Sequence, residues 1–344
     1  MDERRVFELA KKVANCEKVN NMLVESIQTL SEAYNMLLSE MDCFKKNVMY
    51  EVTDKRLEKD LLDVPTVLSC DATLDELLKG KKSMCRFGDG EFACISGNLR
   101  AKFTATYSER LAKKLLEVLA SDDENIMIAI ADNYGSLEKY SEASKREIRS
   151  YMASGAREEH ISLLEPQKTY YNAYVTRPYI TFADAFTDGP KNRFDKLKLL
   201  WKNRDIVLIE GKYTRFGVGN DLLSGAKSVT RILGPAVDAI NKYDEIFKAA
   251  MQEKEDALYL LALGPVATVM AYDLAKTGRQ AVDIGHLDLE YEWFLKGEGV
   301  RVPVPYKYVN EIAGGENVEQ IHDEKYESEI KILEIGRASC RERV

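Results

Sequence analysis

Helix-breaking residues are absent from the first part of this 344-residue sequence, where the first proline is Pro65 and the first glycine is Gly80. A segment of that length without either residue is compatible with one long helix. Long apolar runs are absent as well, since no uncharged stretch approaches the roughly 20 residues that a membrane-spanning helix needs. We therefore expect a helical N-terminal segment and no transmembrane segment.

The sequence also lacks an excess of positive charge. The chain has 49 Lys and Arg against 57 Asp and Glu, a formal net charge of -8, whereas general binding to nucleic acid needs a basic face. The six cysteines form no CxxC pair and have no zinc-site spacing, and the N-terminus lacks the apolar core of a signal peptide. We expect a cytoplasmic protein with reduced thiols and no nucleic acid partner.

Through residues 1–60, apolar side chains repeat in a heptad pattern. The a positions are Val6, Val13, Asn20, Ile27, Tyr34, Met41 and Val48, and the d positions are Leu9, Cys16, Leu23, Leu30, Leu37 and Phe44. A polar Asn20 at an a position favours a parallel two-stranded coiled coil. Lys12 with Glu17, and Glu40 with Lys45, could pair between the two helices. We therefore predict a homodimeric coiled coil.

A second interpretation is a long helix that folds back on its own domain. Val19, Val24, Ala33 and Leu38 occupy e and g positions and widen the apolar stripe, as in helices that lie on a globular core. The two interpretations differ in what covers the stripe, which is either a second chain or the domain of the same chain.

From about residue 62, short apolar runs alternate with amphipathic stretches. We predict strands over 83–87, 126–131, 205–210, 228–233, 257–263 and 280–284, and helices over 108–120, 136–153, 236–252, 265–277 and 288–296. This alternation indicates an α/β fold with a Rossmann-like, mostly parallel sheet and helices on both faces. Ligands in such sheets bind at the carboxyl ends of the strands, so the loops there are the candidate sites.

The loop after the first predicted strand reads RFGDGEF. Gly88 lets the backbone turn tightly, and on an extended stretch Asp89 and Glu91 would share a face. Two hard oxygen ligands on one face suit Mg²⁺ or Mn²⁺, and Arg86 could offset the charge of a phosphate. The alternative is an acidic turn with one surface ion pair.

Two further loops could bind phosphate through backbone N–H groups. In the segment 209–221 these belong to Gly217, Gly219 and Asn220, with Arg215 as a cationic contact. In the strand-to-helix turn at 263–268 the corresponding residues are Gly264 and Thr268. The alternatives are a mobile surface loop for the first and a routine turn for the second.

An acidic loop with one of the chain's three histidines follows the last predicted strand. His286 or Glu290 could act as a general base. A helix here would place Asp288 against Glu292 at i and i+4, which is repulsive without a cation nearby; the alternative is that Asp288 caps the helix. Two smaller candidates are the stretches 176–179, where Arg177 could bind a phosphate, and 307–311. The alternative for both is a surface loop whose polar groups are already hydrogen-bonded within the protein.

Together these motifs resemble a known family. The set RFGDGE, NAYVTRPY, GVGNDL, RILGPA, LGPVATVMAYDLAKTGRQAVDIGHLDLEYEW and KYVNE is similar to the bacterial GT-D family of glycosyltransferases, which occurs in surface-glycan and adhesin-glycosylation clusters. The resemblance implies a Rossmann-like fold, a nucleotide-sugar donor that is typically UDP-glucose, and a metal-binding DxE motif at Asp89 and Glu91. It covers a domain that we place at 62–325, after the coiled-coil segment 1–60. The final residues 335–344, IGRASCRERV, resemble the translation of a sequencing-adapter read-through.

The sequence therefore predicts a metal-dependent glycosyltransferase that moves a sugar, glucose by preference, from a UDP-sugar to a hydroxyl of a glycan or glycoprotein. Mn²⁺ or Mg²⁺ would assist departure of UDP, and the arginines and glycine-rich loops would position the phosphates. Acceptors on lipid carriers would bring the enzyme to the inner membrane surface. The alternatives are a coiled-coil scaffold whose α/β domain binds nucleotide without turnover, and a nucleotide-sugar hydrolase.

Overall fold

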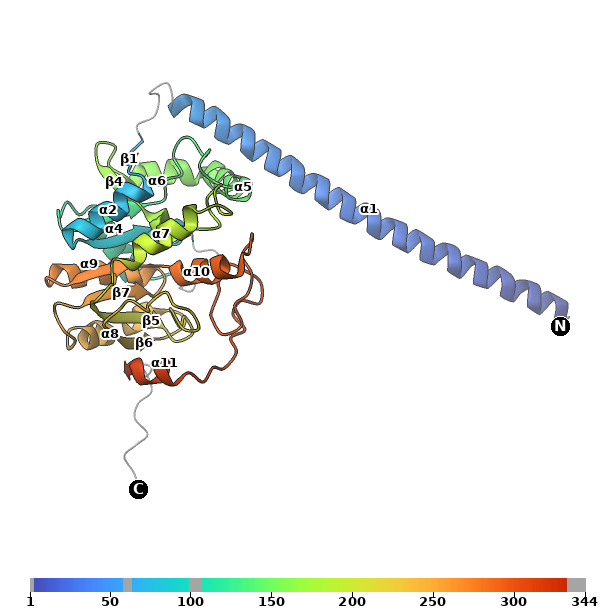
Figure 1. Cartoon of the computed structure of the whole chain (residues 1–344). Coiled ribbons are helices and arrows are strands. Elements are labelled where there is room, and N and C mark those ends of the chain that lie inside the picture. Colours follow the sequence, from blue (N-terminus) through green and yellow to red (C-terminus); the bar gives the residue numbers. More distant parts are fainter. Residues whose placement is uncertain (1–2, 58–63, 99–106, 333–344) are drawn as a thin grey trace.

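The computed structural model describes residues 3–57, 64–98 and 107–332. The final segment that resembles an adapter read-through lies outside the described residues. A single helix and an α/β domain make up the described chain (Figure 1). None of its helices combines the length and the apolar character needed to cross a bilayer.

Helix α1 is 55 residues long, from Glu3 to Leu57, and it projects away from the domain (Figure 1). Only its C-terminal part contacts the domain, at α5 (Glu142–Tyr151) and the π-helical turn η1 (Met152–Ala156). Tyr50 is buried there, and its hydroxyl donates to the backbone carbonyls of Asn133 and Gly135 at 3.3 and 2.9 Å. The helix does not fold back along its own domain, so the second interpretation of the heptad pattern is wrong.

Among the described residues, nine strands form one sheet in the order β1-β4-β3-β2-β8-β7-β5-β6-β9, and every pairing is parallel. The strands are β1 (Thr66–Val67), β2 (Ser83–Phe87), β3 (Ile126–Ile130), β4 (Thr169–Asn172), β5 (Asp205–Gly211), β6 (Ser228–Gly234), β7 (Leu258–Ala262), β8 (Gln280–Asp283) and β9 (Ile330–Ile332). The predicted parallel α/β sheet is confirmed.

Helices cover both faces of this sheet because alternate strand residues point to opposite sides. Cys85 and Phe87 of β2 pack into the core beneath α3 (Asp89–Ser96), α4 (Glu109–Leu119), α8 (Tyr243–Ala250) and α9 (Pro265–Lys276). Met84 packs into the opposite core, beneath α2 (Cys70–Gly80), α7 (Gly189–Lys198) and α10 (Leu287–Lys296). A smaller cluster that includes Tyr50 fixes α1 to the domain.

Short helices complete the chain: α6 (Arg157–Leu163), η2 (Ala173–Thr176), η3 (Ala239–Lys242) and α11 (Glu324–Glu329). The six predicted strands all form, within a residue or two of the expected ends. The helix expected over 136–153 begins only at Glu142, and the helix expected over 236–252 begins at Tyr243 after the η3 turn.

One local expectation is wrong, since Asp89 and Glu91 do not lie on an extended stretch. They occupy the first turn of α3, where Gly88 is the N-cap residue. The Glu91 carboxylate accepts a hydrogen bond from the Gly88 N–H at 2.7 Å, which is half of a capping box. A helix starts here because that bond satisfies a donor that would otherwise have no intrahelical partner.

Candidate active site

The site lies where the sheet changes the direction of its connections. From β2 the chain moves outward to β3 and β4, whereas from β8 it moves through α10 toward β9 at the opposite edge. A crevice at such a switch point, at the carboxyl ends of the strands, is the usual ligand site of an open parallel sheet. A cavity of about 430 Å³ is found there, and it is lined by residues that follow β2 and β8.

Arg86 and Asp283 connect these two central strands. Arg86 Nη2 lies 2.9 Å from Asp283 Oδ1, and its Nε donates to the Asp283 carbonyl at 3.0 Å. Gly285 has φ 46° and donates its N–H to the same carboxylate, and a Cβ at this position would lie 2.0 Å from Arg86 Nη2. The Thr268 hydroxyl donates to the Arg86 carbonyl at 2.7 Å. The predicted phosphate-binding arginine is therefore held in a fixed, already paired position.

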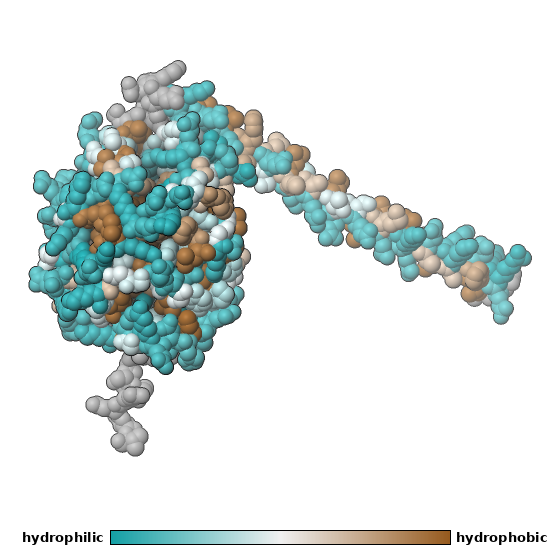
Figure 2. Space-filling model, in the orientation of Figure 1, coloured by the Kyte–Doolittle hydropathy of each residue, from teal (hydrophilic) through white to brown (hydrophobic). Residues whose placement is uncertain are grey.

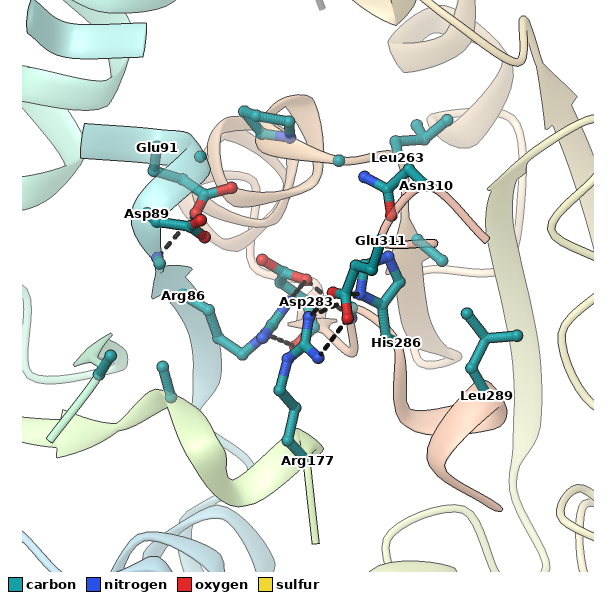
Figure 3. Close-up of a pocket in the computed structure, with 18 of the residues that line it drawn as sticks. Arg86, Asp89, Glu91, Arg177, Leu263, Asp283, His286, Leu289, Asn310 and Glu311 are labelled. Atoms are coloured by element: carbon teal, nitrogen blue, oxygen red, sulfur yellow. Dashed lines mark hydrogen bonds and ion pairs between the residues drawn. The ribbon is translucent and has the colours of Figure 1, made fainter. Parts of the chain in front are cut away.

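Asp89 and Glu91 project from the first turn of α3 toward this cavity (Figure 3). Burial and the nearby charge of Asp283 raise the pKa of Glu91 to about 7. Asp89 is exposed and, among the described residues, accepts no hydrogen bond and forms no ion pair. Two carboxylates without a cationic side chain of their own are a fitting donor set for Mg²⁺ or Mn²⁺.

The protein alone does not complete such a metal site. No group of three or more His, Cys, Asp or Glu side chains within the described ranges is arranged to hold a metal ion. Mg²⁺ commonly takes one or two carboxylates, and its other ligands are waters and substrate phosphates. Asp89 and Glu91 fit that pattern.

A second charged cluster joins three distant parts of the chain (Figure 3). Arg177, which follows η2, forms an ion pair with Glu311, and its Nη2 lies 2.7 Å from His286 Nδ1. His286 Nδ1 also lies 2.9 Å from Glu311 Oε1. Burial opposes the charged form of Glu311, but Arg177 and His286 outweigh it and lower the pKa of this carboxyl well below its usual value. The two sequence stretches treated as minor candidates thus meet His286 at the cavity.

Within the glycine-rich loop after β5, the residues predicted to bind phosphate lie outside the cavity lining. Arg215 is buried, and its Nη1 donates to the carbonyls of Tyr306 and Glu319 at 2.8 and 2.7 Å. The Gly217 N–H and the Asn220 amide donate to Asp288 Oδ1, at 2.9 Å each.

Packing accounts for the glycines of this loop. Gly217 and Gly219 have φ of 73° and 79°, and a Cβ on Gly219 would lie 2.8 Å from the Tyr306 hydroxyl. Neither glycine lines the cavity, nor do Arg215 and Asn220. The predicted phosphate contacts of these four residues stay untested. Because the residues bind or pack against other parts of the protein, the structure does not favour those contacts.

Lys307 resolves the expected repulsion on α10. Its ammonium is buried and lies 2.6 Å from Asp288 Oδ2 and 2.9 Å from Glu292 Oε1. Asp288 therefore pairs with a cation and does not cap the helix, whose N-cap residue is His286.

Glu290 and Thr268, which were predicted to contact substrate, are also buried outside the cavity lining. Glu290 Oε2 accepts the N–H groups of Tyr179 and Ile180, both at 3.1 Å. Burial raises the pKa of Glu290, although Arg177 opposes the shift. Of the two predicted general bases, only His286 lines the cavity.

The cavity has two chemically different ends on either side of this centre. One end, called here the glycine end, is formed by Gly211, Thr214, Gly264, Pro265 and residues 235–238 after β5, β6 and β7. The other, called the tyrosine end, follows β3 and β4 and is closed by α5; it is formed by Asn133, Tyr134, Ser144, Glu147, Tyr151 and Tyr174.

Buried His160 organises the tyrosine end. Its two ring nitrogens lie 3.0 Å from the hydroxyls of Tyr134 and Tyr151, and its ring stacks on Phe92 with 3.8 Å between centroids. Burial lowers the pKa of His160 to about 4, so the ring is neutral at pH 7. Sequence reasoning missed this cluster because its residues lie in separate elements and form no short motif.

Comparison with known proteins gives one consistent result. Residues 84–312 match the model of the glycosyltransferase GT-D fold family. The chain is 36% identical over 269 residues to the probable glycosyl transferase Gly of Streptococcus gordonii, and 32% identical over 284 residues to the glycosyltransferase GlyD of Streptococcus pneumoniae. These matches cover 77% and 81% of this chain but only 38% and 34% of those proteins, so the chain spans little more than a third of its curated relatives.

Solved structures give the same likeness. A structure described as a new glycosyltransferase (DUF1792) from Streptococcus sanguinis shares 32% identity at a TM-score of 0.74, covering 78% of this chain and 99% of that one. A second, described as the highly conserved domain of unknown function 1792 with a distinct glycosyltransferase fold, shares 28% identity at a TM-score of 0.75, covering 83% and 99%.

Proposed function

The chain belongs to the GT-D fold glycosyltransferase family, and we propose that it transfers glucose from UDP-glucose to a hydroxyl of a glycan or glycoprotein, with Mn²⁺ or Mg²⁺ bound. One observation carries the proposal. A single cavity at the β2–β8 switch point holds the two carboxylates of the DxE motif, two half-buried arginine–carboxylate pairs and a histidine. The proposal includes the cytoplasmic location expected from the sequence.

In this proposal the donor occupies the glycine end of the cavity. The N-terminus of α9 at Gly264 and Pro265 lies there, and a helix N-terminus favours the negative charge of a diphosphate. Asp89 and Glu91 would hold the metal beside it. When bound, the metal neutralises charge that develops on the departing diphosphate. Arg86 and Arg177 are fixed by their carboxylate partners and would orient the donor without having to reorganise.

His286 is the proposed general base. This role requires the tautomer in which Nδ1–H donates to Glu311 Oε1, at 2.9 Å, and the N–H groups of Arg177 Nη2, which lies 2.7 Å from Nδ1, are directed at Glu311. Nε2 then holds the lone pair that can accept the proton of the acceptor hydroxyl. Glu311 stays ionised because of Arg177 and His286, so it can stabilise the histidine after the proton transfer. Glu290 is not assigned this role, because two backbone N–H groups already occupy its carboxylate.

The acceptor in this proposal occupies the tyrosine end. Sugar rings pack their C–H faces on aromatic side chains, and their hydroxyls need hydrogen-bonding partners. Tyr134, Tyr151 and Tyr174 offer rings, while Ser144 and Glu147 of α5 offer polar atoms. A donor at one end and an acceptor at the other would meet at Asp89 and His286, between the two.

The test is UDP release from a panel of UDP-sugars, with and without Mn²⁺, on the wild type and on Asp89→Asn. We expect metal-dependent turnover of one UDP-sugar and a loss of about 100-fold or more in the variant. Glu124→Gln is the matched control, because Glu124 is an exposed acid just before β3, at the amino ends of the strands and away from the carboxyl ends where the cavity lies. Metal-independent turnover that survives Asp89→Asn would contradict the proposal.

The same assay separates the alternatives. UDP binding without turnover of any sugar, whatever acceptor is added, would support the scaffold. Sugar release at an unchanged rate with or without acceptor would support a hydrolase. Bulky substitutions then test the two ends: Ser144→Trp should raise the KM for acceptor, and Ala236→Trp the KM for donor. The reverse outcome would exchange the two assignments.

A further inference from the structure

An apolar seam runs along the full length of α1 and has no partner in the structure. Its a and d residues from Val6 to Val48 are all exposed, and the apolar ones among them expose between 41% (Val48) and 72% (Leu30) of their surface. Figure 2 shows apolar residues along the projecting helix. Covering such a stripe is a strong drive for association, because each apolar side chain removed from water stabilises the assembly.

The domain contacts a different face of this helix. In the part of α1 that lies against α5 and η1, the residues with reduced exposure are Cys43, Lys46, Asn47, Tyr50, Thr53 and Asp54. In the heptad register these are c, f and g positions, and the Arg157 guanidinium lies 4.1 Å from the Tyr50 ring centroid. Phe44, Val48 and Val52, at d, a and e, stay exposed beside them. The seam therefore continues past the docking contact without meeting the domain.

The rest of the helix surface fits a two-stranded coiled coil. The f positions, which point away from a partner, are Lys11, Lys18, Glu25, Glu32, Ser39 and Lys46. A g residue of one helix faces the following e residue of its partner, which pairs Lys12 with Glu17 and Glu40 with Lys45. Asn20 is the polar member of the apolar a positions, and such an asparagine specifies register at a cost in stability.

We propose that α1 pairs with α1 of a second copy of this chain as a parallel, in-register coiled coil, with Asn20 opposite Asn20 and Cys16 opposite Cys16. The pair of helices would be roughly 60 Å long over Val6–Val48 at about 1.5 Å per residue. Because both helices run in the same direction, the two α/β domains would lie at the same end of one stalk. Each stalk helix also touches a cavity wall, since Tyr50 binds the Asn133 carbonyl and α5 closes the tyrosine end.

Cys16 gives a direct test of orientation and register. It is an exposed thiol at a d position, so a parallel in-register pair places the two thiols side by side. Mild oxidation of the full chain should yield a disulfide-linked dimer on a non-reducing gel. Cys16→Ser, which keeps every other thiol, should abolish that dimer. An antiparallel pair would place the two Cys16 residues near opposite ends of the stalk and would not give this crosslink.

Sedimentation equilibrium tests the seam itself. Leu30→Asp places a charge at a d position, and we expect the dissociation constant of the dimer to rise by at least about 100-fold. Ser39→Asp adds the same charge at an f position and should leave the dimer intact. If Leu30→Asp unfolds the helix, Asn20→Leu still tests the register, because it should keep the association but weaken the preference for the Cys16 crosslink or change the number of chains.

Two outcomes would overturn the proposal. A wild-type chain that stays monomeric at about 100 µM would show that the seam does not pair. A dimer that resists Leu30→Asp, or that shows no Cys16 crosslink, would place the interface elsewhere or reverse the orientation. Neither outcome depends on glycosyltransferase activity, so this proposal and the proposed function fail separately.

Discussion

Gly285→Ala is the sharpest single test of how the two central strands hold the site together. Gly285 has φ 46°, a left-handed conformation that costs an alanine about 1 kcal/mol. The added Cβ would also lie 2.0 Å from Nη2, 2.6 Å from Cζ and 2.9 Å from Nη1 of Arg86. The Arg86 guanidinium must therefore move by about 1.5 Å to restore ordinary contact distances.

A movement of this size can break the ion pair between Arg86 Nη2 and the buried Asp283 carboxylate, which lie 2.9 Å apart. Leaving a buried carboxylate without its partner costs about 3–5 kcal/mol, so the variant should lose about 3–5 kcal/mol of unfolding free energy if the pair breaks fully. A displacement of this size in a positioning group also costs about 100-fold in kcat. Urea denaturation and metal-dependent UDP release measure the two effects on the same protein.

Gly297→Ala is the matched control, because Gly297 has φ 67° with nothing within 4 Å of the added Cβ. It should lose only the backbone cost of about 1 kcal/mol and keep its activity. In an Arg86→Ala background the clash disappears, so Gly285→Ala should again cost about 1 kcal/mol. If Gly285→Ala were as stable and as active as Gly297→Ala, the contact between Gly285 and Arg86 would not hold the site.

Two further predictions concern buried titratable groups. The pKa of His160 is about 4 in the folded chain and near 6.5 in the unfolded chain, so the unfolded chain binds more protons between these two pH values. The free energy of unfolding should therefore fall as the pH drops from about 6.5 to about 4, by about 3 kcal/mol in total. Urea midpoints measured between about pH 4 and about pH 7 should depend less on pH in His160→Gln than in the wild type, because the variant lacks this ring. The same pH dependence in both proteins would mean that the ring does not stay neutral. Lys307→Met leaves Asp288 and Glu292 facing each other without their cation, and should cost about 3–5 kcal/mol of unfolding free energy. A similar loss in Lys296→Met, whose ion pair with Glu292 is longer and more exposed at 3.9 Å, would argue against this account of the Lys307 cluster.

Local sequence signals were enough for the sheet and for the position of the DxE motif. Runs such as IMIAI and LYLLA are buried on both faces, and continuous apolar strands of this kind are typical of a parallel sheet that is covered by helices on both sides. The conformation of the motif was harder to predict. Asp89 and Glu91 follow a strand directly, yet the Gly88 N–H bonded to Glu91 starts a helix at once.

The glycine-rich loop shows that a glycine can have more than one explanation. Gly217 and Gly219 were predicted to approach a phosphate, which stays a prediction; in the structure they lie close to Leu223 and Tyr306. A glycine indicates only that some atom comes close, and which atom depends on the tertiary fold. The same holds for Arg177 and Glu311, which lie 134 residues apart in the sequence and meet across the cavity. Neither has a neighbour in the sequence that could reveal the other.

The pairing of charges around the cavity bears on how a donor would enter it. Arg86 pairs with Asp283, Arg177 with Glu311 and Arg301 with Glu147, whereas no lysine or arginine among the described residues ion-pairs with Asp89 or Glu91. A diphosphate that approached the metal-free protein would meet the charge of Asp89, and that of Glu91 where it is ionised, and neither carboxylate has an ion-pair partner among the described residues. If the two carboxylates hold the metal as proposed, a divalent cation reverses the sign of the charge at the point where the phosphates must lie. Donor affinity should then depend on the metal at least as strongly as turnover does, and Asp89→Asn should weaken UDP binding in the presence of Mg²⁺ while leaving binding without metal unchanged or stronger.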